Sequence, residues 1–271
     1  MSEPSKALEE KSKTKIIVAL DVETAREAHQ IIADLREDVG AFKIGLQLFT
    51  SAGASFVREV AQSGIKIFLD VKFHDIPNTV AKASVEVARL GVWMFNVHAL
   101  GGGEMMRKTV ENVREVCDKE NLIPPKIIGV TVLTSCNQET LREVGIETKI
   151  ENQVLDLARL AAECGLDGVV ASPHEVKKIR ENIGEKDFLI VTPGIRNSRL
   201  QIPDTKLNDE NESRSGIWNL ESGTIDDQKR VMTPKDAVQA GSDYLVIGRP
   251  ILQATDKILA VREILEEIES E

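Results

Sequence analysis

The chain has 271 residues, of which 42% are hydrophobic and 29% charged, and its formal net charge is −10. This composition excludes a disordered chain, and the acidic balance excludes the broad basic surface with which proteins grip nucleic acid. Aromatic residues make up only 4%, so we expect a core of aliphatic residues, as in parallel strands that are buried on both faces.

The N-terminal segment and the cysteines indicate a soluble, cytoplasmic protein. Residues 1–14 are polar and mixed in charge, without the apolar core of a signal peptide, and we expect them to form a tail before one domain over 15–271. No stretch approaches the roughly 18 apolar residues that span a bilayer, so no membrane association is expected. Cys117, Cys136 and Cys164 show no paired spacing, which is typical of reduced thiols.

Short apolar runs alternate with longer amphipathic segments along the whole chain. The first pair is a strand over 15–20 and a helix capped near Thr24, whose apolar residues are spaced three and four apart. The other predicted strands are 41–44, 67–71, 93–97, 126–132, 168–171, 188–191 and 243–247. The other predicted helices are 51–62, 77–90, one from the glycines at 101–103 to about 119, 152–164, 175–182, one that begins near 233, and 251–269. This alternation predicts a single (β/α)₈ TIM barrel of class α/β, with a doubly wound open sheet as the alternative.

One segment breaks the alternation. Residues 197–225 are polar, rich in Asp, Glu, Asn and Ser, and show no sustained periodicity. Connections this long are uncommon and are usually functional or mobile. We therefore predict a polar insertion after the seventh strand.

In a barrel of this kind the active site lies at the carboxyl ends of the strands, so residues there are the candidates for chemistry. Charges in such partly buried positions need a partner or a ligand. The candidates at or just beyond the strand ends are Asp21, Lys43, Asp70, Lys72, Asp75, Asn96, His98, Thr134, Pro193, Arg196 and Arg249.

The sharpest motif is Leu-Asp-Val-Lys-Phe-His-Asp-Ile-Pro-Asn-Thr, in the third strand and the turn after it. Asp70 and Lys72 are two residues apart, so along an extended strand their side chains point the same way. One interpretation is an internal salt bridge that fills the barrel mouth, with Asp75 as a charge at a helix N-terminus. Because Lys43 and Asp21 belong to neighbouring strands, the four side chains can instead form an alternating network of carboxylates and ammonium groups.

A second motif, Gly248-Arg249-Pro250, follows the last strand. Backbone N–H groups at such a turn, together with a guanidinium, can bind a phosphate, and many barrels hold phosphate in the loops after strands seven and eight. The segment Thr-Pro-Gly-Ile-Arg196 supplies the other loop. A plain helix start with a surface arginine is the alternative. The histidines show no zinc-ligand spacing, so no metal site is expected.

These motifs resemble the orotidine 5′-monophosphate decarboxylase family. The stretch Phe-Leu-Asp-Val-Lys-Phe-His-Asp-Ile-Pro-Asn-Thr-Val is similar to the family signature and is highly specific. Shorter matches follow in family order over nearly the whole chain, from about 16 to 265. They are Val-Ala-Leu-Asp21, Phe-Lys43-Ile-Gly, Asn96-Val-His-Ala, Val-Thr-Val-Leu-Thr134-Ser, Thr-Pro-Gly-Ile-Arg196, Gln228-Lys-Arg-Val-Met-Thr-Pro and Ile-Gly248-Arg249.

The resemblance implies removal of the C6 carboxylate from orotidylate to give uridine monophosphate, a step of de novo pyrimidine biosynthesis, without a metal or organic cofactor. It implies that Lys72 protonates C6 and that Asp70 lies beside the departing carboxylate and holds Lys72. It also implies a homodimer in which Asp75 and Thr79 reach into the neighbouring subunit's site. The implied catalytic residues are Lys72, Asp70, Asp75 and Lys43. The implied substrate-binding residues are Asp21, Lys43, Thr79, Thr134, Pro193, Arg196, Gln228, Gly248 and Arg249.

The insertion at 197–225 departs from the pattern of bacterial relatives, which have a shorter loop there, and it leaves the placement of Gln228 open. Its many acids would repel a phosphate dianion, so we expect the inserted part to bulge into solvent.

Two other functions stay open. One is a magnesium-dependent keto-sugar-phosphate decarboxylase or synthase of the same superfamily, which resembles this chain around Asp70 and Lys72 but carries a metal-binding acid where Lys43 stands. The other is a uridine nucleotide binder without catalysis.

Overall fold

The computed structural model describes residues 12–184, 187–196 and 231–270. In this part of the chain, parallel strands pair in sequence order, and β1 pairs with β8 to close a barrel. The strands are β1 (Ile16–Ala19), β2 (Ala41–Gly45), β3 (Ile67–Phe73), β4 (Met94–His98), β5 (Lys126–Val130), β6 (Gly168–Val170), β7 (Leu189–Thr192) and β8 (Tyr244–Ile247). The predicted barrel is therefore confirmed, and the open sheet is excluded.

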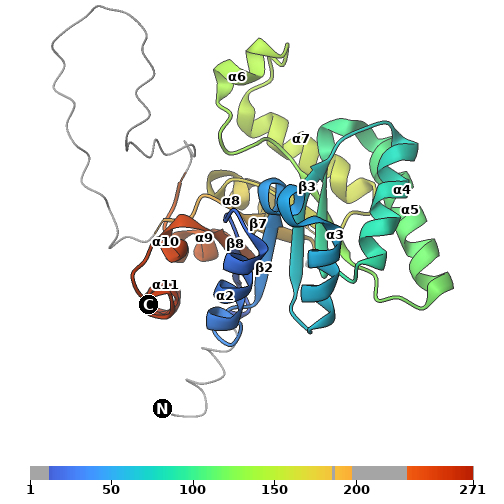
Figure 1. Ribbon diagram of the computed structural model, residues 1–271. Coiled ribbons are helices and arrows are strands. Elements are labelled where there is room, and N and C mark those ends of the chain that lie inside the picture. Colours follow the sequence, from blue (N-terminus) through green and yellow to red (C-terminus); the bar gives the residue numbers. More distant parts are fainter. Residues whose placement is uncertain (1–11, 185–186, 197–230, 271) are drawn as a thin grey trace, which may run out of the picture.

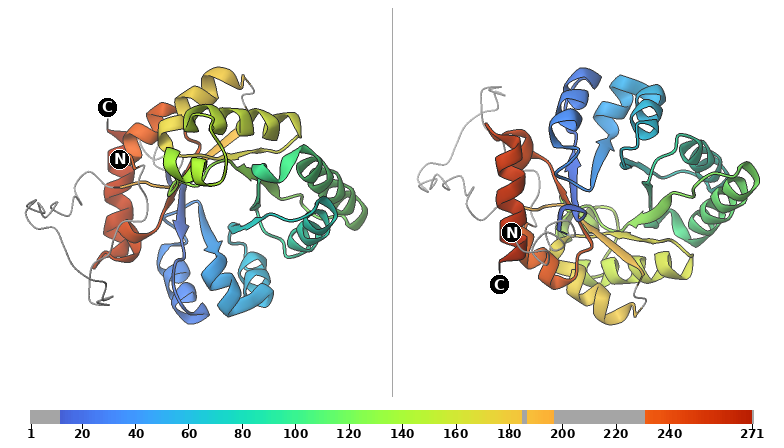
Figure 2. Two further views of the ribbon diagram at one scale, coloured as in Figure 1. Left: turned by 90° about the horizontal axis from the view of Figure 1, so that it is seen from above. Right: turned by 90° about the horizontal axis from the view of Figure 1, so that it is seen from below.

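The helices form an outer ring around the strands, as the two views along the barrel in Figure 2 show. They are α2 (Ala25–Leu35), α3 (Leu46–Gln62), α4 (Pro77–Arg89), the 3₁₀ helix η1 (Ala99–Gly101), α5 (Gly102–Glu120), α6 (Gln138–Glu143), α7 (Ile150–Glu163), α8 (Pro173–Asn182), α9 (Pro234–Ala240), α10 (Arg249–Leu252) and α11 (Lys257–Glu269) (Figure 1). Helix α2 begins as predicted, since the Thr24 side chain accepts a hydrogen bond from the backbone N–H of Glu27 and the Glu27 carboxylate accepts one from that of Thr24.

The core has two layers because alternate residues of each strand face opposite sides. One layer lies between the strands and the helices. The other fills the barrel interior and consists of Ile17, Ala19, Ala41, Phe68, Met94, Ile128, Val191 and Val246, with partly buried neighbours. Asp21, Lys43, Asp70 and Asn96 each come two residues after a member of this inner layer. The same alternation therefore directs polar side chains into the barrel mouth.

The helices differ from the prediction in three places. Helix α3 begins at Leu46 rather than at residue 51, and it is interrupted at Gly53, where a φ of 76° and a ψ of 178° leave the helical region. The predicted closing helix 251–269 is two helices, α10 and α11, because the Asp256 side chain accepts a hydrogen bond from the backbone N–H of Leu259 and starts a new helix. Helix α6 lies in what the sequence predicts only as a long connection.

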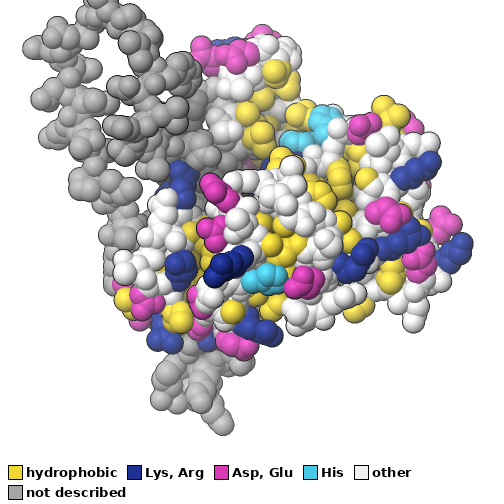
Figure 3. All heavy atoms as spheres, in the orientation of Figure 1, with side chains coloured by type: hydrophobic (Ala, Val, Ile, Leu, Met, Phe, Trp, Pro, Cys, Tyr) yellow, Lys and Arg dark blue, Asp and Glu magenta, His cyan; other side chains and the backbone are white. Residues whose placement is uncertain are grey.

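The predicted insertion at 197–225, and most of the predicted tail at 1–14, lie outside the described residues. The division of the chain into tail, domain and insertion therefore stays a prediction. Among the described residues, no helix is both long and apolar enough to cross a membrane. On the face shown in Figure 3, acidic and basic side chains are interspersed.

Candidate active site

A cavity of about 650 Å³ opens at the carboxyl ends of the strands, a volume that suits a small molecule. Its lining brings together nine of the predicted site residues from six of the strand ends. They are Asp21, Lys43, Asp70, Lys72, Thr134, Pro193, Arg196, Gly248 and Arg249. All six charged residues of the described lining are among the candidates marked from the sequence.

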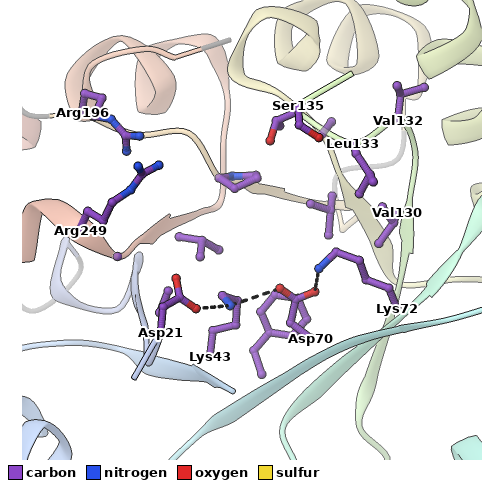
Figure 4. A pocket seen from close by; sticks show the side chains of 18 residues that line it. Asp21, Lys43, Asp70, Lys72, Val130, Val132, Leu133, Ser135, Arg196 and Arg249 are labelled. Carbon is purple, nitrogen blue, oxygen red and sulfur yellow. Dashed lines mark hydrogen bonds and ion pairs between the residues drawn. The ribbon is translucent and has the colours of Figure 1, made fainter. Parts of the chain in front are cut away.

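Four of these side chains form an alternating chain of charges across β1, β2 and β3 (Figure 4). The Nζ atom of Lys43 lies 3.3 Å from Oδ1 of Asp21 and 3.4 Å from Oδ2 of Asp70. The Nζ atom of Lys72 lies 2.6 Å from Oδ1 of Asp70. Each inner charge therefore has an opposite charge on both sides, as burial at this depth requires.

Burial and ion pairing shift the pKa values of Lys43 and Asp70 in opposite directions. Burial by itself would lower the pKa of Lys43, but the charges of Asp70 and Asp21 and their hydrogen bonds outweigh it, and its pKa is raised. Burial would raise the pKa of Asp70, but Lys43, Lys72 and the hydrogen bonds to its carboxylate lower it. Both groups are therefore charged at neutral pH.

The contact between Asp70 and Lys72 does not arise from the regular extended strand assumed from the sequence. The pairing of β3 with β4 shifts register between Leu69 and Phe73, and Lys72 has a φ of 53°. The fully buried Asn96 spans this irregularity, since its Oδ1 accepts a hydrogen bond from the backbone N–H of Lys72 (2.8 Å) and its Nδ2 donates one to Asp70 (2.7 Å). The sequence marks Asn96 as a strand-end residue but gives it no role.

Two arginines lie on the other side of the cavity. In Figure 4, the guanidinium groups of Arg196 and Arg249 approach one another on the side of the cavity opposite Lys72. Gly248 comes directly before α10, and a Cβ atom at this position would lie 3.2 Å from Oδ2 of Asp21. Glycine therefore lets the turn that carries Arg249 approach the charged chain closely.

The rest of the described cavity wall is mostly apolar and was not predicted from the sequence. It includes Val130, Val132, Val170 and Ala171, with Ser135 beside them. The alternation that places Ile128 in the inner layer also turns Val130 inward, so this signal was present in the sequence. A flat ring would fit such a wall, with polar groups at its edges.

Two predicted site residues lie elsewhere, and the position of a third is not described. Asp75 and Thr79, at the start of α4, are exposed and are outside the described lining of the cavity. Asp75 accepts a hydrogen bond from the backbone N–H of Ile76, which is itself 66% exposed. Gln228 lies outside the described residues.

The described residues contain no group of three or more His, Cys, Asp or Glu side chains arranged to hold a metal ion. Asp21 and Asp70, the two carboxylates of the cavity that face a common point, have the ammonium group of Lys43 between them. A cation is therefore already provided by the protein at the place where two acids could otherwise share a divalent ion.

Comparison with known proteins agrees with this geometry. Residues 14–264 match the family described as Orotidine 5'-phosphate decarboxylase / HUMPS family. The chain belongs to this family. Proteins named orotidine 5′-phosphate decarboxylase from Syntrophotalea carbinolica and Geobacter sulfurreducens are each 48% identical to it, over 95% and 96% of this chain and 96% and 98% of theirs. The resemblance stated from the motifs is thus confirmed.

The fold of this decarboxylase family is also found among solved structures. A crystal structure of orotidine 5′-phosphate decarboxylase from Lactobacillus acidophilus superposes with a TM-score of 0.75 at 37% sequence identity. The match covers 94% of this chain and 99% of that one. The similarity therefore extends over almost the entire length of both proteins.

Proposed function

We propose that this chain converts orotidine 5′-monophosphate to uridine 5′-monophosphate and carbon dioxide. The observation that carries the proposal is the alternating chain Asp21, Lys43, Asp70 and Lys72, which faces Arg196 and Arg249 across one cavity. A substrate with a phosphate at one end and a reacting carboxylate at the other matches cations at both ends. The names of the relatives, which state this activity of those proteins, support the same proposal.

The reaction breaks the bond between C6 and the carboxylate carbon and leaves the electron pair on C6. The ammonium of Lys72 stabilises the charge that develops there and then donates a proton from Nζ to C6, while carbon dioxide leaves. The resulting amine of Lys72 regains a proton from water. The 2.6 Å contact with Asp70 orients the Lys72 side chain before the reaction.

Repulsion between Asp70 and the substrate carboxylate is at most a partial contribution. Two charges about 4 Å apart interact by only about 4 kcal/mol at an effective dielectric constant near 20. Enzymes commonly lower activation barriers by roughly 8–23 kcal/mol. Stabilisation of the transition state by Lys72 must therefore supply more than repulsion in the ground state.

The remaining residues bind the parts of the substrate that do not react. We propose that Lys43 and Asp21 contact the ribose hydroxyls and that Thr134 lies at the edge of the pyrimidine. Gln228 would bridge the base and the phosphate. The phosphate would be held by Arg249 and the N–H of Gly248, with Arg196 and Pro193 in the opposite loop. Binding energy from the distant phosphate can then be used to hold C6 against Lys72.

We propose that no metal or organic cofactor takes part. The support is chemical: Lys43 supplies a fixed positive charge between two carboxylates, at 3.3 and 3.4 Å, where a metal-dependent relative would need an acid. A lysine at this position opposes the binding of a divalent cation.

We also propose a cytoplasmic homodimer in which Asp75 and Thr79 complete the partner's site. Ile76, which lies between Asp75 and Thr79 in the chain, is 66% exposed, and an exposed apolar side chain at this place suits an interface. All three cysteines lie in the described residues as free thiols, which suits a reducing compartment. The family activity would place the enzyme in pyrimidine biosynthesis.

The test is the fall in ultraviolet absorbance of orotidylate after addition of purified, EDTA-treated protein, with product analysis. Rapid formation of uridine monophosphate that added Mg²⁺ does not increase is the expected result. Turnover of a keto-sugar phosphate only after Mg²⁺ is restored would contradict it in favour of the metal-dependent activity. Tight binding of uridine monophosphate without turnover would favour a non-catalytic binder.

A further inference from the structure

The backbone at Lys72 departs from the strand that surrounds it. Three residues of β3 lie opposite the single residue Asn96 of β4, because the register shifts between Leu69 and Phe73. The φ of Lys72 is 53°, a left-handed conformation that residues other than glycine rarely adopt. A bulge with such a backbone persists only where surrounding contacts hold it, and it redirects the side chain that it carries.

One amide holds both ends of this irregularity. Oδ1 of Asn96 accepts a hydrogen bond from the backbone N–H of Lys72 at 2.8 Å, and Nδ2 donates one to Oδ1 of Asp70 at 2.7 Å. The amide can be oriented only this way, because the opposite orientation would set donor against donor and acceptor against acceptor. Asn96 is fully buried, so water does not compete for either bond.

The position of the reacting ammonium depends on the same two groups that Asn96 contacts, the backbone of Lys72 and the carboxylate of Asp70. The Lys72 side chain is 28% exposed and has several rotatable bonds, so the place of Nζ is fixed by its backbone and by Oδ1 of Asp70, 2.6 Å away. Asn96 bonds to both, yet it is not among the described residues that line the cavity. Its influence on a bound molecule must therefore pass through Lys72 and Asp70.

We propose that Asn96 is a positioning residue that holds the proton donor Lys72 in its reactive place, an inference that rests on the proposed decarboxylation. Its amide stabilises the bulge of β3 and the orientation of Asp70 at once. Its loss impairs proton transfer at C6 and leaves binding of the nucleotide largely intact. A merely structural asparagine would instead affect the stability of the barrel and leave proton transfer unchanged in the folded fraction.

The test compares Asn96→Ala and Asn96→Asp with native protein. Asn96→Asp has nearly the same size and keeps the acceptor for the N–H of Lys72, but it removes the donor to Asp70. Thr109→Val is the matched control, because Thr109 is a fully buried polar residue of α5 whose hydroxyl donates to the Met105 carbonyl oxygen, away from the cavity. The measurements are kcat, KM, the affinity for uridine monophosphate, the melting temperature, and exchange of the C6 hydrogen of uridine monophosphate in D₂O.

The exchange reaction isolates the proton transfer between Lys72 and C6. It moves a proton between C6 and Lys72 without forming carbon dioxide, as microscopic reversibility of the proposed mechanism requires. We expect kcat and the exchange rate to fall together by about 100-fold in both Asn96 variants, the effect of a small misplacement of a reacting group. Affinity for uridine monophosphate should change little, and Thr109→Val should lose thermal stability but keep both rates.

A folded Asn96 variant with native kcat and exchange would overturn the inference, and so would a raised KM with unchanged kcat. Loss of the folded state in both Asn96 variants would also overturn it, in favour of a purely structural role. Native protein is measured in parallel. If the native protein neither decarboxylates orotidylate nor exchanges the C6 hydrogen, the proposed function fails, which is a different result from failure of the inference about Asn96.

Discussion

Replacement of Lys72 by alanine is the perturbation for which the structure predicts the largest change in activity. An ammonium about 4 Å from the charge that develops on C6 contributes about 4 kcal/mol at an effective dielectric constant near 20. Loss of this stabilisation slows the reaction about 1000-fold, since each 1.36 kcal/mol corresponds to a factor of about ten. Loss of the general acid adds a further factor of roughly 10² to 10⁴.

We therefore expect kcat of Lys72→Ala to fall by about 10⁵-fold or more. The variant should fold, because Asp70 keeps its contacts with Lys43 and Asn96. The assay follows orotidylate absorbance, with calorimetric titration of uridine monophosphate to establish that the cavity is intact. Lys177→Ala, a change at an exposed position on α8, is the control and should be fully active. A Lys72→Ala protein that binds the nucleotide and keeps kcat within about tenfold of native would refute the reasoning.

Three further predictions concern the phosphate, acid stability and the shared site. Arg249→Ala should lower kcat/KM for orotidylate roughly 10- to 100-fold in steady-state assays, because a charge-assisted hydrogen bond is lost; an unchanged value would exclude the phosphate role. The pKa of Asp70 is lowered from 3.8, so its stabilising contribution is present above that value and is lost as the pH falls through the lower pKa of the folded state. The difference in unfolding free energy between native and Asp70→Asn protein, from urea titrations, should therefore shrink in acid, and a constant difference would contradict this. Mixing inactive Lys72→Ala and Asp75→Asn subunits should restore about a quarter of native activity, since one site of each hybrid dimer is intact, whereas no recovery after subunit exchange would argue against shared sites.

The barrel could be predicted because the sequence signals for its strands and helices lie within each element. Apolar runs followed by amphipathic segments occur eight times along the chain, and caps such as Thr24 mark where some of the helices begin. Parallel strands joined by helices have few ways to close. The alternation of side chains then brings Asp21, Lys43 and Asp70 to one mouth. Helix bounds were less accurate at α3 and at the break before α11, where single residues, Gly53 and Asp256, decide between continuation and interruption.

The part of the site that could not be predicted depends on contacts between strands. From the sequence, β3 is expected to be a regular strand. Only its shifted pairing with β4 in the structure reveals the left-handed backbone conformation of Lys72 and the hydrogen bond from Lys72 to Asn96. Asn96 does occur in the motif Asn-Val-His-Ala, so the residue was visible even though its two hydrogen bonds were not. The roles of Asp75 and Thr79 depend on a second subunit, and they stay predictions for that reason.

The most direct test of the central claim is the identity of the product formed from orotidylate in D₂O. We expect one equivalent of carbon dioxide for each uridine monophosphate, with deuterium at C6 seen by proton NMR as loss of the C6–H signal. The label would show that the broken bond is replaced by a proton delivered from an exchangeable group such as the ammonium of Lys72. Folded, EDTA-treated protein that forms no uridine monophosphate, or forms it with hydrogen at C6, would contradict the account.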